Sequence, residues 1–253
     1  MTIARHMGLS RPERPDYGID GGYIGIAVFA TVGVGLAWSV RWALQRRRFT
    51  LAGLAGSAIG AVAGSAASFF YSTGPGKRAL WAELLDELAL RGDERLLDVG
   101  CGRGAVLILA AQRLPQGHAV GADLWRRRDQ SGNSRAAAER NARLEGMAKR
   151  VELVEADARK LPFPSDSFDV VVSHIAIHNI ADLQGRHQAL REMVRVLRPG
   201  GRLRVVDDGA EHYPTTLRDA GCTDIVVRRL DWRTWYGVPG HHLPLVDAVK
   251  PAG

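Results

Sequence analysis

The stretch Leu96–Ala111 reads Leu-Leu-Asp-Val-Gly-Cys-Gly-Arg-Gly-Ala-Val-Leu-Ile-Leu-Ala-Ala and decides the fold of this chain. Apolar residues surround Asp98, glycines then alternate with other residues from Gly100 to Gly104, and an apolar helical pattern follows. This pattern predicts a buried strand that turns sharply into a helix, where glycines let a ligand approach the backbone. The third glycine comes one residue too early for the dinucleotide fingerprint G-x-G-x-x-G. Because Asp98 would repel a phosphate, the turn favours a ligand with a positively charged group.

The charge of the chain is concentrated in its first 78 residues. These hold nine Lys and Arg against three acids, whereas the remaining residues hold twenty-five against twenty-four, for a net charge of +7. The larger part of the chain is therefore nearly neutral, and its composition does not indicate a nucleic-acid partner. Two cysteines, Cys101 and Cys222, give no disulfide framework. A chain of 253 residues is long enough for one large domain with an appendage.

Two uncharged stretches precede the glycine turn. Residues 21–40 carry no charge and match the length of a bilayer core, and residues 49–76 form a second such stretch after the basic cluster Arg46–Arg48. The predicted segments are a polar, loose tail over 1–20, a transmembrane or membrane-associated hairpin over 21–71 with helices at about 21–44 and 50–71, and a domain over 72–253. The junction at 72–77 is expected to be flexible.

Small residues recur on the second apolar stretch at four-residue intervals, at Gly56, Gly60, Gly64 and Ser68. Such a face lets two helix backbones touch, so it is expected to join the two helices. The same face could pair two copies of the chain in a homo-oligomer. The alternative is that the second stretch is a buried or interfacial helix lying against the domain.

Alternating strand and helix signals follow the hairpin. The expected strands are 96–99, 118–122, 151–155, 170–173, 203–206, 224–230 and 243–250. The expected helices are 77–90, the stretch after the glycine turn, one that begins at Asn133 or Ser134 and ends at Leu144, 190–197 and 215–221. This order predicts an α/β fold with a Rossmann-like, doubly wound sheet of seven strands.

Further motifs follow the glycine turn in a fixed order. Asp123 ends the second expected strand, Asp157-Ala158 follows the third, Leu-Pro-Phe-Pro-Ser-Asp-Ser-Phe-Asp spans 161–169, and Leu-Arg-Pro-Gly-Gly spans 197–201. Together with the glycine turn, these motifs resemble the class I S-adenosylmethionine (SAM)-dependent methyltransferases. The resemblance covers residues 77–230 and is to the small-molecule branch of the ubiquinone-biosynthesis type, the methyltransferase type 11/25-like group.

The resemblance implies that SAM is the cofactor and methyl donor. Asp98 would face the ammonium group, Asp123 the ribose hydroxyls and Asp157 the adenine amino group. The full set of cofactor-binding residues that it implies is Asp98, Gly100, Cys101, Gly102, Gly104, Asp123, Leu124, Asp157, Ala158 and Ser173. Lys77 or Arg78 could meet the cofactor carboxylate or could simply be solvated. The segment 124–133, with three arginines, departs from the pattern of many relatives, which pass directly into a helix.

The catalytic candidates are His174 and His178, which follow the fourth expected strand. They are four residues apart, and either could orient a substrate or accept its proton, because histidine titrates near neutral pH. Alternatively, backbone hydrogen bonds could satisfy both. No third ligand stands at a useful spacing, so no metal is expected. Asp207 and Asp208 could line the acceptor side, and the aromatic segment 232–242 could be a substrate lid, a membrane contact or ordinary packing.

We therefore expect a membrane-anchored SAM-dependent methyltransferase with a small or lipid-like acceptor. The alternatives are a SAM-binding membrane scaffold without turnover and a methyltransferase of a soluble small amine that is merely localised to the membrane. The resemblance places the catalytic domain in the cytoplasm, where SAM is made. A hairpin would then put Arg46–Arg48 outside, against the positive-inside bias, although the flanking charges nearly balance. A single span with a re-entrant second stretch would avoid this conflict.

Overall fold

Seven strands form one sheet in the order β3-β2-β1-β4-β5-β7-β6. This computed structural model describes residues 13–21 and 24–252. The strands are β1 (Arg95–Val99), β2 (His118–Asp123), β3 (Val151–Glu155), β4 (Phe168–His174), β5 (Leu197–Val206), β6 (Thr223–Arg229) and β7 (Pro244–Val249). The pairs among β1 to β5 are parallel, and β7 runs antiparallel to both of its neighbours. The predicted doubly wound α/β sheet is confirmed.

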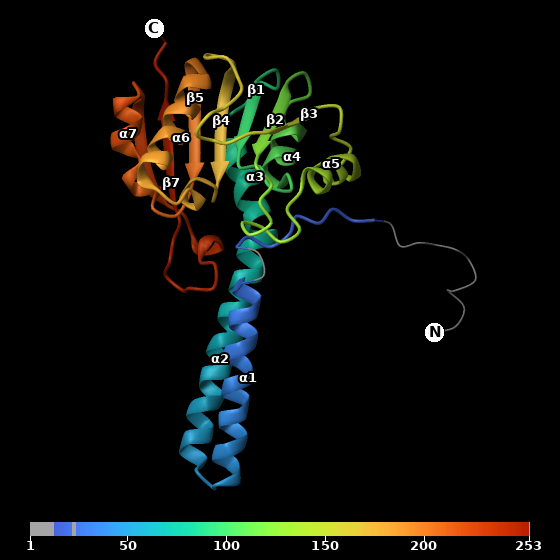
Figure 1. Cartoon of the computed structure of the whole chain (residues 1–253), viewed down its shortest axis with the longest axis vertical. Coiled ribbons are helices and arrows are strands. Elements are labelled where there is room, and N and C mark those ends of the chain that lie inside the picture. The colour runs from blue at the N-terminus through green and yellow to red at the C-terminus, as the bar shows by residue number, and fades with distance from the viewer. Residues whose placement is uncertain (1–12, 22–23, 253) are drawn as a thin grey trace, which may run out of the picture.

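Helices cover both faces of the sheet. They are α3 (Lys77–Glu87), α4 (Ala105–Gln112), α5 (Arg135–Leu144), α6 (Leu183–Val196) and α7 (Pro214–Asp219), whereas the first two helices, α1 (Ile24–Gln45) and α2 (Phe49–Tyr71), extend away from the sheet (Figure 1). Successive β1 side chains point to opposite faces, so Leu96 packs with α3 and α4 while Leu97 packs with α6. Trp81 of α3 and Met193 of α6 are fully buried on these two faces. The result is a three-layer domain with a core on each side of the sheet.

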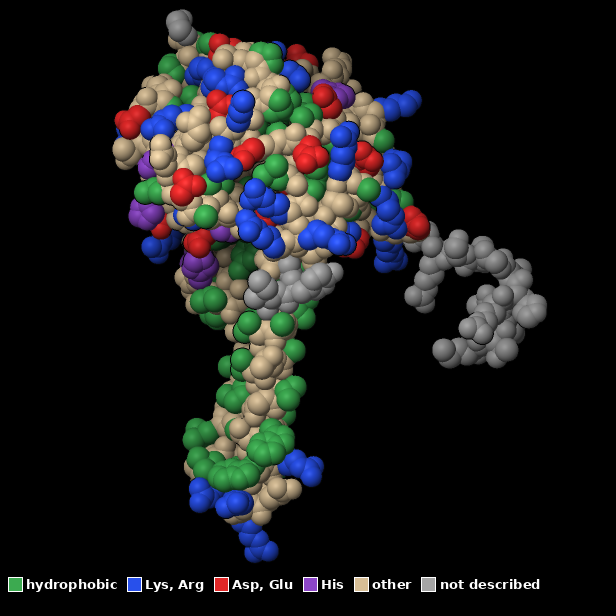
Figure 2. Space-filling view, viewed as in Figure 1, with side chains coloured by type: hydrophobic (Ala, Val, Ile, Leu, Met, Phe, Trp, Pro, Cys, Tyr) green, Lys and Arg blue, Asp and Glu red, His purple; other side chains and the backbone are tan. Residues whose placement is uncertain are grey.

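The hairpin formed by α1 and α2 extends from the edge of the sheet where the parallel strands end (Figure 1). The two helices lie side by side, and among the residues whose burial is described only Ala43 and Ala52 are buried, both close in sequence to the loop at the tip. The stretches Ile26–Gln45 and Phe49–Glu87 are long and apolar enough to cross a membrane, by length and composition. Hydrophobic side chains are spread along the hairpin among other side chains and backbone, and Lys and Arg side chains gather at its tip (Figure 2).

Two expectations about the hairpin are wrong. A Cβ atom added at Gly56, Gly60 or Gly64 would meet no atom within 4 Å, so the small-residue face does not lie between α1 and α2. The junction with the domain is not a flexible linker, because a π-helical turn at Ser72–Gly76 joins α2 and α3 into one continuous helix. Ser72 is fully buried in this turn, which fixes the hairpin to the domain.

Residues 13–21 differ from the loose tail that their polarity suggested. Asp16 and Asn141 exchange hydrogen bonds of 2.8 and 3.0 Å, and the Tyr17 hydroxyl donates to Glu145 at 2.7 Å. Ile19 pairs with Ser131 in both directions. Residues 13–21 therefore lie along the domain before the chain enters the hairpin. The rest of the expected tail, 1–12, lies outside the described residues.

Several element ends also differ from expectation. Helix α6 begins at Leu183 and not at 190, because the Asp182 carboxylate caps it by accepting from the backbone N–H of Gly185. Strand β5 begins at Leu197, since the Pro-Gly-Gly turn lies within it as an irregularity in the pairing with β4. Ser134 caps α5, which is one of the two caps expected.

Candidate functional site

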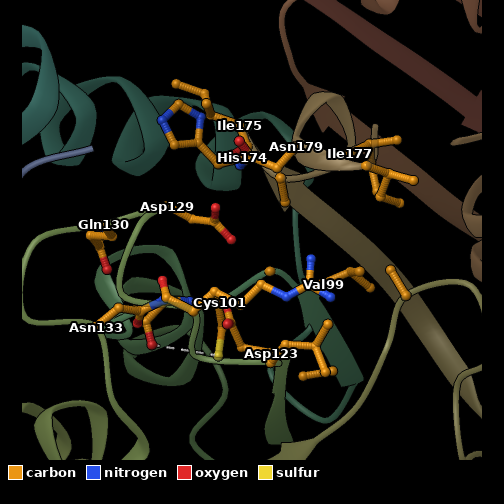
Figure 3. A pocket seen from close by; sticks show the side chains of 18 of the residues that line it. Val99, Cys101, Asp123, Asp129, Gln130, Asn133, His174, Ile175, Ile177 and Asn179 are labelled. Atoms are coloured by element: carbon orange, nitrogen blue, oxygen red, sulfur yellow. Dashed lines mark hydrogen bonds between the residues drawn. The ribbon is translucent and has the colours of Figure 1, made fainter. Parts of the chain in front are cut away.

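A cavity of about 260 Å³ lies at the carboxyl ends of β1, β2 and β4 (Figure 3). Its wall combines the glycine turn after β1, the loop after β2 and the turn after β4. This is the place where open parallel sheets bind ligands, because the strand order reverses between β1 and β4. Eight of the predicted cofactor residues line it, namely Asp98, Gly100, Cys101, Gly102, Asp123, Leu124, Asp157 and Ala158.

The glycine turn packs closely against two neighbouring side chains. Gly100 has a φ of +78°, and a Cβ atom there would overlap the Ala176 side chain. Gly102 has a φ of +53°, and its Cβ would stand 2.6 Å from the Gln130 amide oxygen. Both positions therefore require glycine for conformation and for close approach. Gly104 starts α4 with a φ of +86° but lies outside the cavity wall, beside Ile108.

Asp98 gives the cavity an unpartnered negative group. The side chain is 1% exposed, and neither carboxylate oxygen has a hydrogen-bond partner among the described residues. Burial, with a smaller contribution from the nearby Asp123 charge, raises the pKa of Asp98 to about 7. A buried carboxylate without a partner is costly, so it marks a site for a cationic or hydrogen-donating ligand. The ammonium group of SAM fits this requirement.

Asp123 and Asp157 already hold internal partners. Asp123 accepts from the backbone N–H groups of Gly102 at 2.8 Å and Trp125 at 2.5 Å, and burial raises its pKa. The Arg159 guanidinium binds both oxygens of Asp157, with a closest contact of 2.6 Å, and lowers the pKa of that carboxyl. Both carboxylates thus line the cavity with part of their hydrogen-bonding capacity already used, Asp123 by two backbone N–H groups and Asp157 by the Arg159 guanidinium.

The two remaining cofactor-binding candidates, Cys101 and Ser173, differ in position. The buried Cys101 lines the cavity, and burial raises the pKa of its thiol. Ser173 lies outside the wall, because its hydroxyl donates to the Val99 carbonyl at 2.8 Å and so ties β4 to β1.

A buried polar cluster closes the cavity on the hairpin side. Lys77 donates to both carboxylate oxygens of Asp20 at 2.8 and 2.9 Å, and Gln130 donates to the same carboxylate at 3.1 Å. The Tyr236 hydroxyl donates to Asp20 at 3.2 Å and contacts Nε2 of His174 at 3.1 Å. Lys77 was one of the open candidates from sequence. Asp20, Gln130 and Tyr236 carried no local signal, since they come from three segments that meet only in the fold.

The two candidate histidines have different surroundings. His174 lines the cavity and is 9% exposed, and burial together with the Lys77 charge lowers its pKa to about 3. His178 contacts the buried Asp207 carboxylate through Nδ1 at 2.5 Å and through its backbone N–H at 3.0 Å. Although burial opposes it, the hydrogen bond and charge of Asp207 raise the pKa of His178. His178 is not part of the cavity wall, but its neighbours Ile177 and Asn179 are (Figure 3).

The aromatic segment 232–242 packs against the base of the hairpin. Trp232 stacks on Tyr71 of α2 with ring centroids 5.0 Å apart, and the backbone N–H of Tyr236 donates to the Ser72 hydroxyl at 3.3 Å. Gly237 lies against Phe69 of α2. Of the three roles expected for this segment, the contacts favour packing, and they link the hairpin to the cavity wall through Tyr236.

Comparisons with known proteins agree with this geometry. The family model described as "Methyltransferase domain" matches residues 97–205. Over 133 residues the chain is 38% identical to the ubiquinone/menaquinone biosynthesis C-methyltransferase UbiE of Roseobacter denitrificans, covering 52% of this chain and 50% of that protein. It is 37% identical over 128 residues to the demethylmenaquinone methyltransferase of Thermus thermophilus, covering 50% of this chain and 53% of that protein. The chain thus spans about half the length of the curated relatives it matches.

Solved structures share the fold. The [4+2]-cyclase SpnF matches 68% of this chain and 81% of its own, with a TM-score of 0.56 and 24% identity. Geranyl diphosphate methyltransferase in complex with SAM matches 68% of this chain and 85% of its own, with a TM-score of 0.54 and 20% identity.

Residues 97–205 thus match the methyltransferase class, and the chain shares its fold with a methyltransferase solved in complex with SAM. Within that class, its domain is similar to that of the quinone-biosynthesis C-methyltransferases.

Proposed function

We propose that this protein is a membrane-anchored SAM-dependent methyltransferase that methylates a lipid-like acceptor. One observation carries the proposal: Asp20 and Lys77, which flank the hairpin in sequence, form an ion pair in the wall of the cavity. The two helices therefore leave the domain directly beside the candidate site. An acceptor dissolved in the bilayer would have a short path to it.

The surface of the hairpin supports an anchor. Val34, Trp38 and Leu54 are 70%, 71% and 64% exposed, and apolar residues gathered in this way are unfavourable in water. At the tip, the guanidinium groups of Arg46 and Arg48 lie 5.1 and 5.5 Å from the Trp42 ring. Tryptophan and arginine together suit the boundary between hydrocarbon and headgroups. We infer that the tip crosses to the far interface while the domain stays in the cytoplasm.

The residues of the cavity support SAM binding and transfer. Asp98 would hold the ammonium group, Asp123 the ribose, and Ala158 with Asp157 the adenine, while Gly100 and Gly102 keep space for the cofactor. SAM supplies an activated methyl group, so the protein has mainly to align the donor and the acceptor. His174 ends β4 and His178 lies in the turn that follows it, and we infer that the acceptor binds beside them.

Radiolabelled transfer in proteoliposomes tests the proposal. Full-length protein, methyl-labelled SAM and three acceptors would be used: reduced demethylmenaquinone, phosphatidylethanolamine and water-soluble ethanolamine. We expect label in a lipid product, lost in Asp123→Ala and retained in Asp219→Ala, an exposed residue at the end of α7. Label only in ethanolamine would favour a soluble acceptor, and tight SAM binding without transfer would favour a scaffold. Either result contradicts the proposal.

Topology and assembly need separate measurements. A compartment-sensitive reporter at the N-terminus should report the cytoplasm if the hairpin is correct, because both ends of a hairpin lie on one side. Activity on the far side would favour the single span. The open Gly56–Gly64 face could pair with a second copy, and crosslinking in membranes would detect a homo-oligomer.

A further inference from the structure

The two histidines after β4 are not equivalent, and their hydrogen bonds distinguish them. Asp20 is ionised, because Lys77 lowers its pKa despite the opposing effect of burial, so the Tyr236 hydroxyl donates to it. The oxygen of Tyr236 must then accept from Nε2–H of His174. His174 is thus fixed as a neutral ring in the wall of the cavity.

His178 is held in the opposite tautomer. The Asp207 carboxylate is fully buried and can only accept, so Nδ1 of His178 carries the hydrogen that joins them. Nε2 is then the free acceptor nitrogen, and no partner contacts it among the residues that the structure describes. Ile177 and Asn179, which flank His178 in this turn, line the cavity, whereas the His178 side chain lies outside the wall and is 28% exposed.

Several other contacts fix this pair. Asp207 also accepts from the backbone N–H of Asp208 at 2.9 Å and from the Tyr213 hydroxyl at 3.1 Å. Arg186 of α6 donates to the His178 carbonyl at 2.8 Å, which holds the turn in place. A carboxylate with four donors cannot rotate freely, so the imidazole is oriented before any substrate binds.

We propose that His178 accepts, through Nε2, the proton that the methyl acceptor loses, and that Asp207 is the positioning residue that fixes this tautomer. The inference rests on the methyltransferase function proposed above. The acceptor atom forms a bond to the methyl carbon, the sulfur keeps the electron pair of the bond that breaks, and the hydrogen of the acceptor passes to Nε2 as a proton. The acceptor must therefore carry an ionisable O–H, N–H or activated C–H group.

The charges around His178 support this assignment. Asp207 and Asp208 favour the protonated ring, while Arg186 opposes it and the buried Tyr213 remains neutral. The neighbouring His174 stays uncharged and so does not compete for the proton. The two environments separate the pKa values of the histidines, which is how one site assigns a base and a neutral polar group.

Nuclear magnetic resonance of ¹⁵N-histidine-labelled, full-length protein in nanodiscs tests the pair without an acceptor. His178→Gln would assign the signal. At high pH we expect hydrogen on Nδ1 and not on Nε2, and a titration with a pKa above 6.5. Asp207→Asn should move that pKa below 6.5, because burial then acts without the counter-charge. Hydrogen on Nε2 at high pH, or a pKa unchanged by Asp207→Asn, would overturn the inference.

Transfer assays test the proton step itself. His178→Gln should reduce kcat by about a hundredfold or more, the usual contribution of a general base, and leave the SAM dissociation constant unchanged. His212→Gln changes a histidine whose side chain is 81% exposed and should not affect kcat. If the wild type labels a lipid acceptor and His178→Gln keeps a third of the wild-type kcat, the assignment of His178 as the base is wrong, although the proposed function holds. If the wild type labels nothing, the proposed function fails and the titration alone decides the tautomer.

Discussion

Replacing Asp98 by asparagine should make the free protein more stable and its cofactor binding weaker. The carboxylate is buried with no partner, and its pKa stands at about 7 against an ordinary value of 3.8. Between these two pH values the folded state holds a proton that the unfolded state has lost, so stability falls as pH rises. Above pH 7 the buried charge lowers the free energy of unfolding by about 4 kcal/mol, at about 1.4 kcal/mol for each unit by which the pKa is raised.

Asparagine has nearly the same shape and no charge, so Asp98→Asn should lack this pH dependence. At pH 8 we expect the variant to unfold about 10 °C above the wild type, since each kcal/mol shifts the midpoint by about 2–4 °C in a protein of this size. At pH 5 the cost falls to about 1.6 kcal/mol, so the difference should shrink to about 3–6 °C. SAM should bind the variant at least about tenfold more weakly, because a charge-assisted hydrogen bond is lost.

Tryptophan fluorescence during heating at both pH values, with and without SAM, measures these effects in detergent-solubilised full-length protein. Asp86→Asn is the control, because that carboxylate is 68% exposed and its 2.7 Å ion pair with Arg113 is screened by solvent and should contribute little to stability. The reasoning is refuted if Asp98→Asn is no more stable than the wild type at pH 8, or if it binds SAM as tightly.

Three further changes have definite expected outcomes. Gly100→Ala places a methyl group into the turn at a φ of +78° and should weaken SAM binding more than about tenfold by calorimetry; wild-type affinity would contradict the close approach. Lys77→Met leaves the Asp20 carboxylate without its cation and should lower the free energy of unfolding by about 3 kcal/mol, with partial recovery on adding Asp20→Asn; no recovery would contradict the pairing. Because the pKa of His178 is raised, its pair with Asp207 stabilises the fold fully below pH 6.5 and progressively less above it. Denaturation at pH 6 and 9 should show that His178→Gln loses this contribution at pH 6 only.

Local patterns predicted the sheet well because each strand is short, apolar and bounded by turn residues. Leu96–Val99 and the glycine turn after it are a strand and a helix start in the structure, within one residue of the expected ends. The predicted ends of elements were wrong where a distant contact or a capping contact determines them. Helix α6 begins seven residues early because Asp182 caps it, and the π-helical turn at Ser72–Gly76 replaces a junction that proline and glycine made look flexible.

The residues of the candidate site likewise include some that the sequence predicted correctly and some whose position depended on the fold. Asp98 and Gly100 were found from sequence because their role depends on one strand and the turn that follows it. Gly104 lies in the same turn and Ser173 lies on the neighbouring strand β4, yet the Gly104 Cβ position and the Ser173 side chain face the packed interior. The motif therefore predicts where the backbone approaches the cofactor, whereas the direction of each side chain depends on the packing around it.

The sequence by itself determined a SAM-type α/β domain behind two apolar helices, because strand periodicity, glycine spacing and charge are local properties. Only the tertiary structure decided which residues meet. The pair Asp20–Lys77 joins positions 57 apart, and the pair His178–Asp207 joins positions 29 apart. His178 and Asp207 meet because the parallel strands β4 and β5 bring their carboxyl ends to one edge, whereas Asp20 reaches Lys77 because the segment before the hairpin lies along the domain.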